Sequence, residues 1–378
     1  IPASVTEVSA YAFQSCSNLA EIEFLATKKA DKDETQIEVK PLTISKDFID
    51  SCSNLREIIF PERLQEVEDI TTVLSQFKEL ESISVVGSCE GQVYTSYDGM
   101  LCNNTAAGAD TVIYCPISKE FTNLNKDTDK DPYYVWNIPS NITKIGSNAF
   151  NITYKPYENY QYNLNKIVFP SLMVEIGDHA FYDMAFLREV VFTGDGSGNH
   201  SGFTIGDYAF AKCDNLSKVE FTEEGEMTRQ EDVFTYKATT TCGITSIGSH
   251  AFDGCPLTKI LLPSTLEEVG EYAFAYNDAL TDINFSHAKT NVDYANYAFY
   301  DCDGLTVLNL TDNIYIEGFN AIFRGCSGIS EISVSKTNPF YTTDSQGVLY
   351  NKDITTVVFF PDGYKGDYEL PSTVKKIA

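Results

Sequence analysis

The chain has 378 residues and a formal net charge of −27 at pH 7. A surface this acidic repels phosphate backbones and anionic lipid headgroups, which argues against nucleic acids and membrane surfaces as partners. Hydrophobic residues make up 43% and aromatic residues 13% of the chain, which excludes a disordered chain and predicts a sizeable core. No apolar run approaches the ~18–20 residues needed to cross a bilayer, so we expect no membrane insertion by this segment.

One pattern recurs along the chain and is clearest in residues 244–262, ITSIGSHAFDGCPLTKILL. An apolar pair is followed by Gly248, an Ala-Phe pair, Cys255 and an alternating apolar run. From Phe252 to Phe323 the corresponding anchor residues lie 22, 25 and 24 residues apart, which predicts a repeated unit of about 22–25 residues. In chain order the anchors are Phe13, Ile49, Leu74, Phe150, Phe181, Phe210, Phe252, Phe274, Phe299 and Phe323.

Each anchor is followed by an L-x-x-I-x-F pattern whose last two apolar residues lie two apart, the period of a β-strand. Alternation sends these two residues inward and the residues between them to solvent. A single unit cannot bury its apolar side, whereas stacked units bury a continuous column. The patterns are Leu19-Ile22-Phe24, Leu55-Ile58-Phe60, Leu80-Ile83-Val85, Leu164-Ile167-Phe169, Leu187-Val190-Phe192, Leu216-Val219-Phe221, Leu257-Ile260-Leu262, Leu280-Ile283-Phe285, Leu305-Leu308-Leu310 and Ile329-Ile332-Val334.

A second apolar pair precedes the anchor and predicts a shorter extended segment that closes each coil, as in Ile142-Ile145, Ile244-Ile247 and Leu266-Val269. Glycines follow this pair, where we expect the chain to turn sharply. The Ala-Phe segment that comes next is predicted to be a short helical or 3₁₀ turn, with Phe filling the core. The glycines are Gly146, Gly177, Gly206, Gly248 and Gly270.

The combined pattern I-P-x-x-[VI]-T-x-I-G-x-x-A-F-x-x-C-x-x-L-x-x-I-x-F resembles the BspA-like leucine-rich repeats of bacterial surface proteins. Residues 1–25, 42–61 and 142–334 carry it, with a weaker copy at 64–86. Met184 and Tyr276 lie near the usual Cys position, and Pro256 shortens one repeat. The resemblance implies a repeat solenoid over residues 1–378, a β-rich leucine-rich-repeat fold of the α/β horseshoe-like kind. Both ends fall inside repeats, so we expect a fragment of a longer chain.

Two stretches interrupt the repeats and resemble each other, YTSYDGMLCNNTAAGADTVIYCP from residue 94 and YTTDSQGVLYNKDITTVVFFP from residue 341. Each predicts a β-hairpin insertion, placed within about 87–137 and about 336–369. BspA-like proteins often carry such a unit. Residues 26–40 are expected to form an exposed loop, 194–202 a flexible Gly-rich loop, and 222–243 a long polar excursion on one repeat.

The ten cysteines form no CxxC pair, so a structural zinc site is not predicted. Equivalent positions in successive repeats stack, so disulfide bridges are not required. Six of them occupy one repeat position, where we expect small buried hydrophobes with a weak S–H donor. Cysteine usage therefore does not identify the redox compartment. The six are Cys16, Cys52, Cys213, Cys255, Cys302 and Cys326.

The residue patterns give little support for a catalytic or metal-binding site. His179 and His250 share a slot that Asn or Tyr fills in other repeats, which predicts a half-buried rim position. His200 and His287 each adjoin a serine but have no orienting acid in a predictable place, so a catalytic triad is not indicated. The acidic run 127–131 begins like an EF-hand but has Pro132 where Gly is needed, so an exposed acidic loop is expected ahead of a looser calcium site. We expect no enzyme, metal or cofactor.

The solvent-facing strand positions predict a mixed polar and apolar stripe, acidic at its N-terminal end and containing lysines in its middle. Such a stripe is how repeat proteins bind extended partners, although a plain solvated sheet explains it equally well. Aromatic residues outside the anchor slots favour protein or carbohydrate contacts, or else pad the loops against the array. The candidate binding residues are Tyr133, Tyr134, Trp136, Tyr157, Tyr160, Lys166, Lys218 and Lys259.

The resemblance implies an extracellular or cell-surface protein, attached to the bacterium through a terminus outside this segment. Its implied function is non-enzymatic binding and adhesion to host extracellular proteins, microbial surface proteins and glycans. The alternative is a carbohydrate-binding or scaffolding component of a bacterial surface complex. The repeat positions encode the scaffold, so specificity is expected where the repeat is interrupted.

Overall fold

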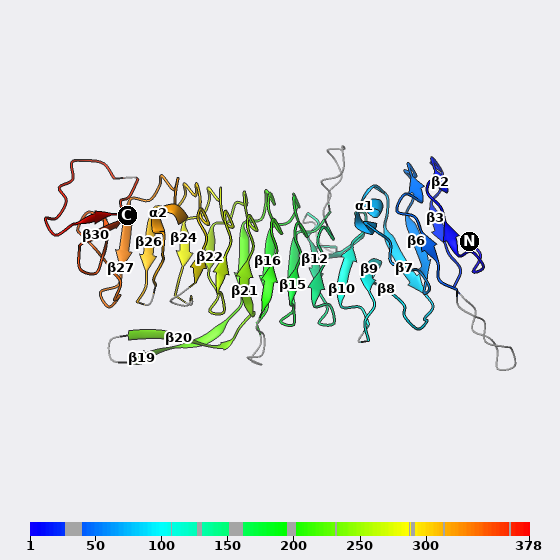
Figure 1. Ribbon diagram of the computed structural model, residues 1–378, viewed down its shortest axis with the longest axis horizontal. Helices are drawn as coiled ribbons and strands as arrows, with labels where there is room; N and C mark the ends of the chain where they lie inside the picture. The colour runs from blue at the N-terminus through cyan, green and yellow to red at the C-terminus, as the bar shows by residue number, and fades with distance from the viewer. Residues whose placement is uncertain are drawn as a thin grey trace.

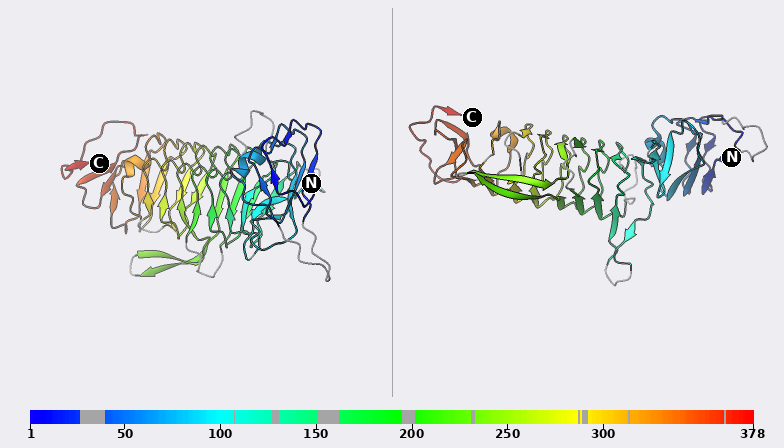
Figure 2. Two further views of the ribbon diagram at one scale, coloured as in Figure 1. Left: turned by 45° about the vertical axis from the view of Figure 1, so that its right-hand side comes forward. Right: turned by 90° about the horizontal axis from the view of Figure 1, so that it is seen from below.

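The computed structural model shows an elongated array with the two chain ends at opposite ends of its long axis (Figure 1). The array is gently curved when seen from below (Figure 2). The structure describes residues 1–26, 40–106, 108–126, 131–150, 162–194, 202–230, 233–286, 288, 292–312, 314–362 and 364–378.

The L-x-x-I-x-F segments form a column of parallel strands, as the alternation predicts. In β14 and β16, Ile167 pairs with Val190 and both side chains are buried, whereas Lys166 and Glu189 point outward beside them. The strands of this column are β3 (Glu21–Glu23), β6 (Glu57–Pro61), β7 (Ser82–Val86), β12 (Tyr134–Asn137), β14 (Lys166–Phe169), β16 (Glu189–Phe192), β18 (Lys218–Phe221), β22 (Lys259–Leu261), β24 (Asp282–Asn284), β26 (Val307–Leu310) and β27 (Glu331–Val334).

The second apolar pairs form another column of short parallel strands on the other side of the core. Six of these strands belong to one nine-stranded sheet in the order β25-β23-β21-β17-β15-β13-β10-β9-β8. The repeat strands of this column are β1 (Glu7–Val8), β4 (Thr43–Ile44), β13 (Lys144–Ile145), β15 (Glu175–Ile176), β17 (Phe203–Ile205), β21 (Ile244–Ile247), β23 (Glu268–Val269) and β25 (Asp293–Tyr294).

Two antiparallel units interrupt the repeats within residues 87–137 and 336–369. The first joins the nine-stranded sheet of the second column, and the second forms a separate four-stranded sheet with the strand that follows it. In each, the last strand of a three-stranded meander pairs in parallel with the next repeat, Val112 with Ile145 and Val357 with Ile377 of β31 (Lys376–Ile377). The strands are β8 (Tyr94–Tyr97), β9 (Met100–Asn103) and β10 (Thr111–Tyr114) in the first unit, and β28 (Tyr341–Thr343), β29 (Leu349–Asn351) and β30 (Thr356–Phe359) in the second.

The polar excursion at 222–243 contains a third hairpin that the sequence did not predict. Strands β19 (Glu224–Gln230) and β20 (Val233–Thr240) pair in antiparallel fashion. The hairpin projects from the array and runs along the long axis toward the C-terminal end (Figures 1 and 2). Period-2 alternation is weak in this polar stretch, which is why the pattern indicated only a loop.

The Ala-Phe segments are turns that add a third line of hydrogen bonds between successive repeats. The Phe210 amide donates to the Ala251 carbonyl at 2.8 Å, and the Phe252 amide donates to the Ala273 carbonyl at 2.7 Å. In the first two repeats this segment forms strands β2 (Phe13–Gln14) and β5 (Ile49–Asp50). The described residues contain only two short helices, α1 (Ile70–Ser75) and α2 (Phe319–Ile322), so turns rather than a helical layer close the coils.

The chain turns at the repeated glycines as expected, since the Ala251 amide donates to the Gly248 carbonyl at 3.3 Å, but close packing is what requires glycine there. A Cβ on Gly248 would lie 2.7 Å from the carbonyl carbon of Gly206, and one on Gly270 would lie 2.5 Å from the Ser249 nitrogen. Neighbouring turns therefore approach too closely for any side chain at this position. The left-handed backbone occurs two residues later, at His250 with φ 55° and Tyr272 with φ 55°.

Stacked phenyl rings form the centre of the core. Phe252 is fully buried, with ring centroids 5.2 Å from Phe210 and 5.3 Å from Phe274 and planes within 2° and 5° of parallel. The same geometry repeats along the column, so the anchor position is one continuous stack. Its rings are Phe150, Phe181, Phe210, Phe252, Phe274, Phe299 and Phe323.

The repeated cysteines are hydrogen-bond donors to the backbone of the preceding repeat. The Cys255 Sγ lies 3.2 Å from the Phe210 carbonyl oxygen, and the Cys302 Sγ lies 3.2 Å from that of Phe274. In the repeat between them Asn277 takes this slot, because its Nδ2 donates to the Phe252 carbonyl at 2.9 Å. The sequence pattern placed Tyr276 near this slot, and the residue that occupies it is Asn277.

Five of the six repeat cysteines are buried as predicted, but Cys16 is exposed. The Cys16 Sγ donates to the Gln14 carbonyl of its own repeat at 3.7 Å. Burial raises the pKa of the Cys213 thiol to about 12 and also raises that of Cys255. All ten thiols are free in the structure.

Candidate binding surface

Three successive strands place a charged ladder on the outer face of the first column. Lys166, Glu189 and Lys218 are direct neighbours on β14, β16 and β18. The Glu189 carboxylate lies 3.2 Å from the Lys166 Nζ and 2.6 Å from the Lys218 Nζ. Lys218 also reaches Glu220 at 2.8 Å. Two of the candidate lysines therefore meet at one carboxylate.

The ion pairs of this ladder shift the pKa values of Glu189 and Lys218. Partial burial acts to raise the pKa of the Glu189 carboxyl, but the hydrogen bonds from Lys218 and Lys166 outweigh it and lower the pKa overall. The hydrogen bonds to Glu189 and Glu220 raise the pKa of Lys218. Glu189 and Lys218 are therefore charged across the physiological pH range.

Tyr133 and Tyr134 lie beside this ladder, at the start of β12. Desolvation raises the pKa of the Tyr133 phenol, and the nearby negative charge of Glu189 adds to the effect. The Tyr134 amide donates to the Asn165 side chain at 2.8 Å, and the Tyr134 side chain is half-buried. Tyr133 is thus near Glu189, and Tyr134 lies beside Asn165, the residue that precedes β14.

Trp136 does not belong to the surface. Its side chain is only 5% exposed, and its ring centroid lies 6.1 Å from Phe121 and 5.3 Å from Phe150. Alternation along β12 explains this, because Trp136 pairs with the buried Ile167 and so points inward with it. The indole fills the core, and the interpretation of Trp136 as an exposed contact residue is corrected.

The other candidates lie outside the ion pairs of the ladder or outside the described part of the chain. Lys259 is exposed on β22, the strand after β18 in the column, and lies opposite Asp282 on β24. Tyr157 and Tyr160 lie outside the described residues, as do His200 and His287 and residues 127–130 of the acidic run.

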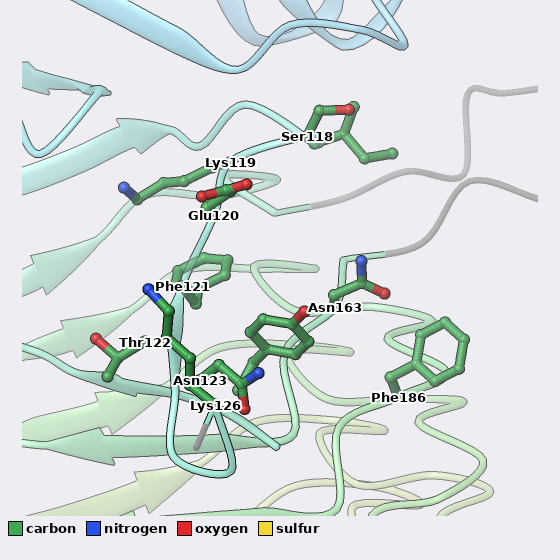
Figure 3. Close-up of a pocket in the computed structure, with 11 residues that line it drawn as sticks. Ser118, Lys119, Glu120, Phe121, Thr122, Asn123, Lys126, Asn163 and Phe186 are labelled. Atoms are coloured by element: carbon green, nitrogen blue, oxygen red, sulfur yellow. The ribbon is translucent and has the colours of Figure 1, made fainter. Parts of the chain in front are cut away.

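A pocket adjoins the ladder where the first insertion leads into β12. Its volume is about 910 Å³, and the segment 117–126 lines one side while Asn163 and Phe186 line the other (Figure 3). Phe121, Asn123 and Tyr134 also face it. The Lys119 Nζ lies 2.9 Å from the Asp98 carboxylate, so an ion pair joins this wall of the pocket to the turn between β8 and β9 of the same insertion.

The sequence did not predict this pocket, because its walls come from segments about 60 residues apart that no motif links. One signal was present. Phe186 is 45% exposed, and it is a large apolar residue just before Leu187, at a repeat position that is small or polar in the other copies.

A ladder of half-exposed rings runs along the rim formed by the residues before each Ala-Phe pair. The ring centroids of His179, Tyr208, His250, Tyr272 and Tyr297 are successively 4.9, 4.5, 4.9 and 5.1 Å apart. His179 and His250 are half-buried, as the slot predicts. The His250 Nδ1 also lies 2.7 Å from Asp253, so this imidazole is held by stacking and by a carboxylate.

Within the described ranges, no three or more His, Cys, Asp or Glu side chains gather closely enough to hold a metal ion. In the same ranges, neither helix is long and apolar enough to span a membrane.

Solved leucine-rich-repeat structures share this fold. A protein from Eubacterium ventriosum is 18% identical, with 91% of this chain and 85% of that chain covered and a TM-score of 0.50. One from Bacteroides ovatus is 16% identical, with 95% and 83% covered and a TM-score of 0.50. At these identities the likeness concerns the fold alone. No curated protein matches the chain.

The repeat pattern itself has a family match. Six copies of the BspA type leucine rich repeat region match residues 1–91, 135–242 and 245–365. The segments between the matches contain the first insertion, which departs from the repeat in the structure as well. Because the matched residues cover most of its length, the chain belongs to the BspA type leucine-rich-repeat family.

Proposed function

We propose that this chain is a non-enzymatic binding protein of the cell surface or the secreted space, and that it adheres to host extracellular or microbial surface proteins. Membership of a leucine-rich-repeat family supports a role in protein interaction. In this proposal residues 1–378 act as one solenoid, and the units within 87–137 and 336–369 are insertions that add specificity to a uniform scaffold.

The observation that carries the proposal is the charged ladder beside the pocket. A partner lying across β12, β14, β16 and β18 would meet Lys218 and Glu220 as exposed charges and could insert an apolar side chain against Phe186. Charged rims around an apolar anchor are the usual anatomy of a protein interface. Specificity then arises from the interrupted repeat, and affinity from the sheet face.

A second candidate, carbohydrate binding within a surface complex, is favoured by the composition of the pocket. Tyr134 and Phe186 supply rings, and Asn123 and Asn163 supply amides. Such a pocket suits a neutral sugar, because aromatic rings pack against the apolar faces of the sugar ring and amides form hydrogen bonds with its hydroxyl groups. This alternative uses the pocket without the charged ladder, so the two candidates differ in which side chains matter.

The test is a panel of host extracellular proteins and glycans probed with the chain and three variants. Phe186→Ala removes the pocket ring, Lys218→Ala removes a ladder charge, and Lys259→Ala is the control for an exposed lysine elsewhere on the same face. We expect a protein ligand to bind less tightly to both Phe186→Ala and Lys218→Ala, by about fivefold or more, and to bind Lys259→Ala normally.

A glycan ligand that depends on Phe186 but not on Lys218 would favour the second candidate. Ligands that bind all three variants as tightly as the parent chain would overturn the assignment of this surface. Turnover of any panel member would overturn the non-enzymatic role.

A further inference from the structure

Four tyrosines from two successive repeats gather at one end of the rim ladder, and we call Tyr272, Tyr276, Tyr297 and Tyr300 the tyrosine cluster. Tyr300 stands nearly perpendicular to its three neighbours, with centroid distances of 5.6 Å to Tyr272, 5.5 Å to Tyr276 and 5.8 Å to Tyr297. Tyr276 is 47% exposed. The cluster therefore presents the Tyr276 ring to solvent, packed against Tyr300, which in turn contacts the other two rings.

A carboxylate lies one repeat away from the exposed ring. The Tyr276 amide donates to the Tyr300 carbonyl at 2.8 Å, and the Asp301 amide donates to the Arg324 carbonyl at 3.0 Å, so Tyr276 and Asp301 occupy the same slot of consecutive repeats. Desolvation raises the pKa of the Tyr276 phenol, and the nearby charge of Asp301 acts in the same direction. The Asp301 carboxylate is thus the acidic group that follows Tyr276 along the array.

The chain already uses ring faces on this rim to hold its own cations. The Lys212 Nζ lies 5.6 Å from the centroid of Tyr182, and the Arg324 guanidinium lies 5.9 Å from that of Tyr297. Both distances are within the range of a cation–π interaction. In the described part of the chain, no lysine or arginine forms a salt bridge with Asp301.

We propose that the tyrosine cluster, with Asp301, binds an arginine or lysine side chain from a basic segment of a partner protein. The exposed ring offers a π face, the Asp301 carboxylate offers charge, and the chain's net charge of −27 steers a basic segment toward it. This surface lies on the rim and is separate from the sheet face and pocket, so it adds a second contact to the proposed function and does not depend on it.

The probe is a fluorescently labelled hexa-arginine peptide, whose binding is followed by anisotropy at an ionic strength of about 0.15 M, where distant charges are screened. Tyr276→Ala should weaken binding about three- to tenfold, while Tyr276→Phe keeps the π face and should bind as the parent chain does. Tyr11→Ala is the matched control. Tyr11 is 57% exposed, and its backbone is left-handed like that of Tyr276, with φ 60° at Tyr11 and 55° at Tyr276.

Loss of charge is tested separately by comparing Asp301→Asn with Asp282→Asn, which removes one carboxylate from the sheet face. Asp301→Asn should weaken binding severalfold and Asp282→Asn should not. Equal losses for the two variants, or unchanged binding by Tyr276→Ala, would show that the peptide senses only net charge and would overturn the site. Lys218→Ala should leave peptide binding intact, which separates this result from the test of the sheet face.

Discussion

Replacing Phe252 by alanine tests whether the phenyl stack holds successive repeats together. Phe252 is fully buried between Phe210 and Phe274, with centroids 5.2 and 5.3 Å away. Loss of a buried phenyl group costs about 3–5 kcal/mol through lost transfer free energy and the residual cavity. Each aromatic pair adds about 0.5–1.5 kcal/mol, and Phe252 makes two, so we expect a value near the top of that range, about 4–5 kcal/mol.

The assay must resolve position, because long repeat arrays do not unfold as one two-state unit. Amide hydrogen exchange reports local opening, and the Phe252 and Phe274 amides are donors to the next repeat, to the Ala273 and Ala298 carbonyls. Both amides should lose protection in Phe252→Ala. The Ile83 amide, which donates to the Gly99 carbonyl near the other end of the array, should keep it.

Phe252→Leu is the matched control, since it retains most of the buried volume and should cost about 1–2 kcal/mol. If alanine costs no more than leucine, the stack contributes little and the reasoning fails. If Ile83 loses as much protection as Phe252, the array unfolds as a single unit and the nearest-neighbour description is refuted.

Three further outcomes are expected. Glu189→Gln should cost about 1 kcal/mol at neutral pH, and because the folded-state pKa of Glu189 is lowered, the difference from the parent chain should vanish in acid denaturation profiles as the pH falls through that pKa. A difference that persists in strong acid would contradict the ion-pair explanation. A thiol reagent should label the exposed Cys16 first and the buried Cys213 only on unfolding. Burial shields the Cys213 thiol and raises its pKa to about 12, so little reactive thiolate is present. Mass spectrometry of the labelled peptides measures the order of labelling. Cys255→Asn should unfold at a higher urea concentration than Cys255→Val, since asparagine can still donate to the Phe210 carbonyl, and equal midpoints would argue against a hydrogen-bonding role.

The sequence predicted the repeats well because every unit buries apolar side chains at the same positions. The period-2 pairs and the anchor phenylalanines are set by burial alone, so Ile167, Val190 and Phe252 lie where the pattern places them. Trp136 was misplaced because it was grouped with nearby tyrosines instead of being counted along its own strand. The glycine column was predicted from the turn alone, since close approach of neighbouring turns depends on residues 20–40 positions away.

The candidate site was only partly predictable. Lys166 and Lys218 were recognised as outward-facing, but their meeting at Glu189 depends on the register of three strands. The pocket and the tyrosine cluster combine residues from different repeats or from an insertion, and no periodic pattern reports such neighbours. Phe186 and Tyr276 are both large residues at repeat positions where the other described copies have small or polar residues. Such a departure from the repeat is the sequence signal that indicates an exposed contact residue.

Asn277 shows what the cysteine slot selects. The slot needs a group that reaches the carbonyl of the preceding repeat and donates a proton to it, and an amide does this as readily as a thiol. The number of cysteines in such an array therefore says nothing about whether the protein meets oxidants. It also gives a rule for engineering: an array with asparagine in every slot would keep its backbone hydrogen bonds and be immune to thiol oxidation, so it could be displayed in air without a reductant.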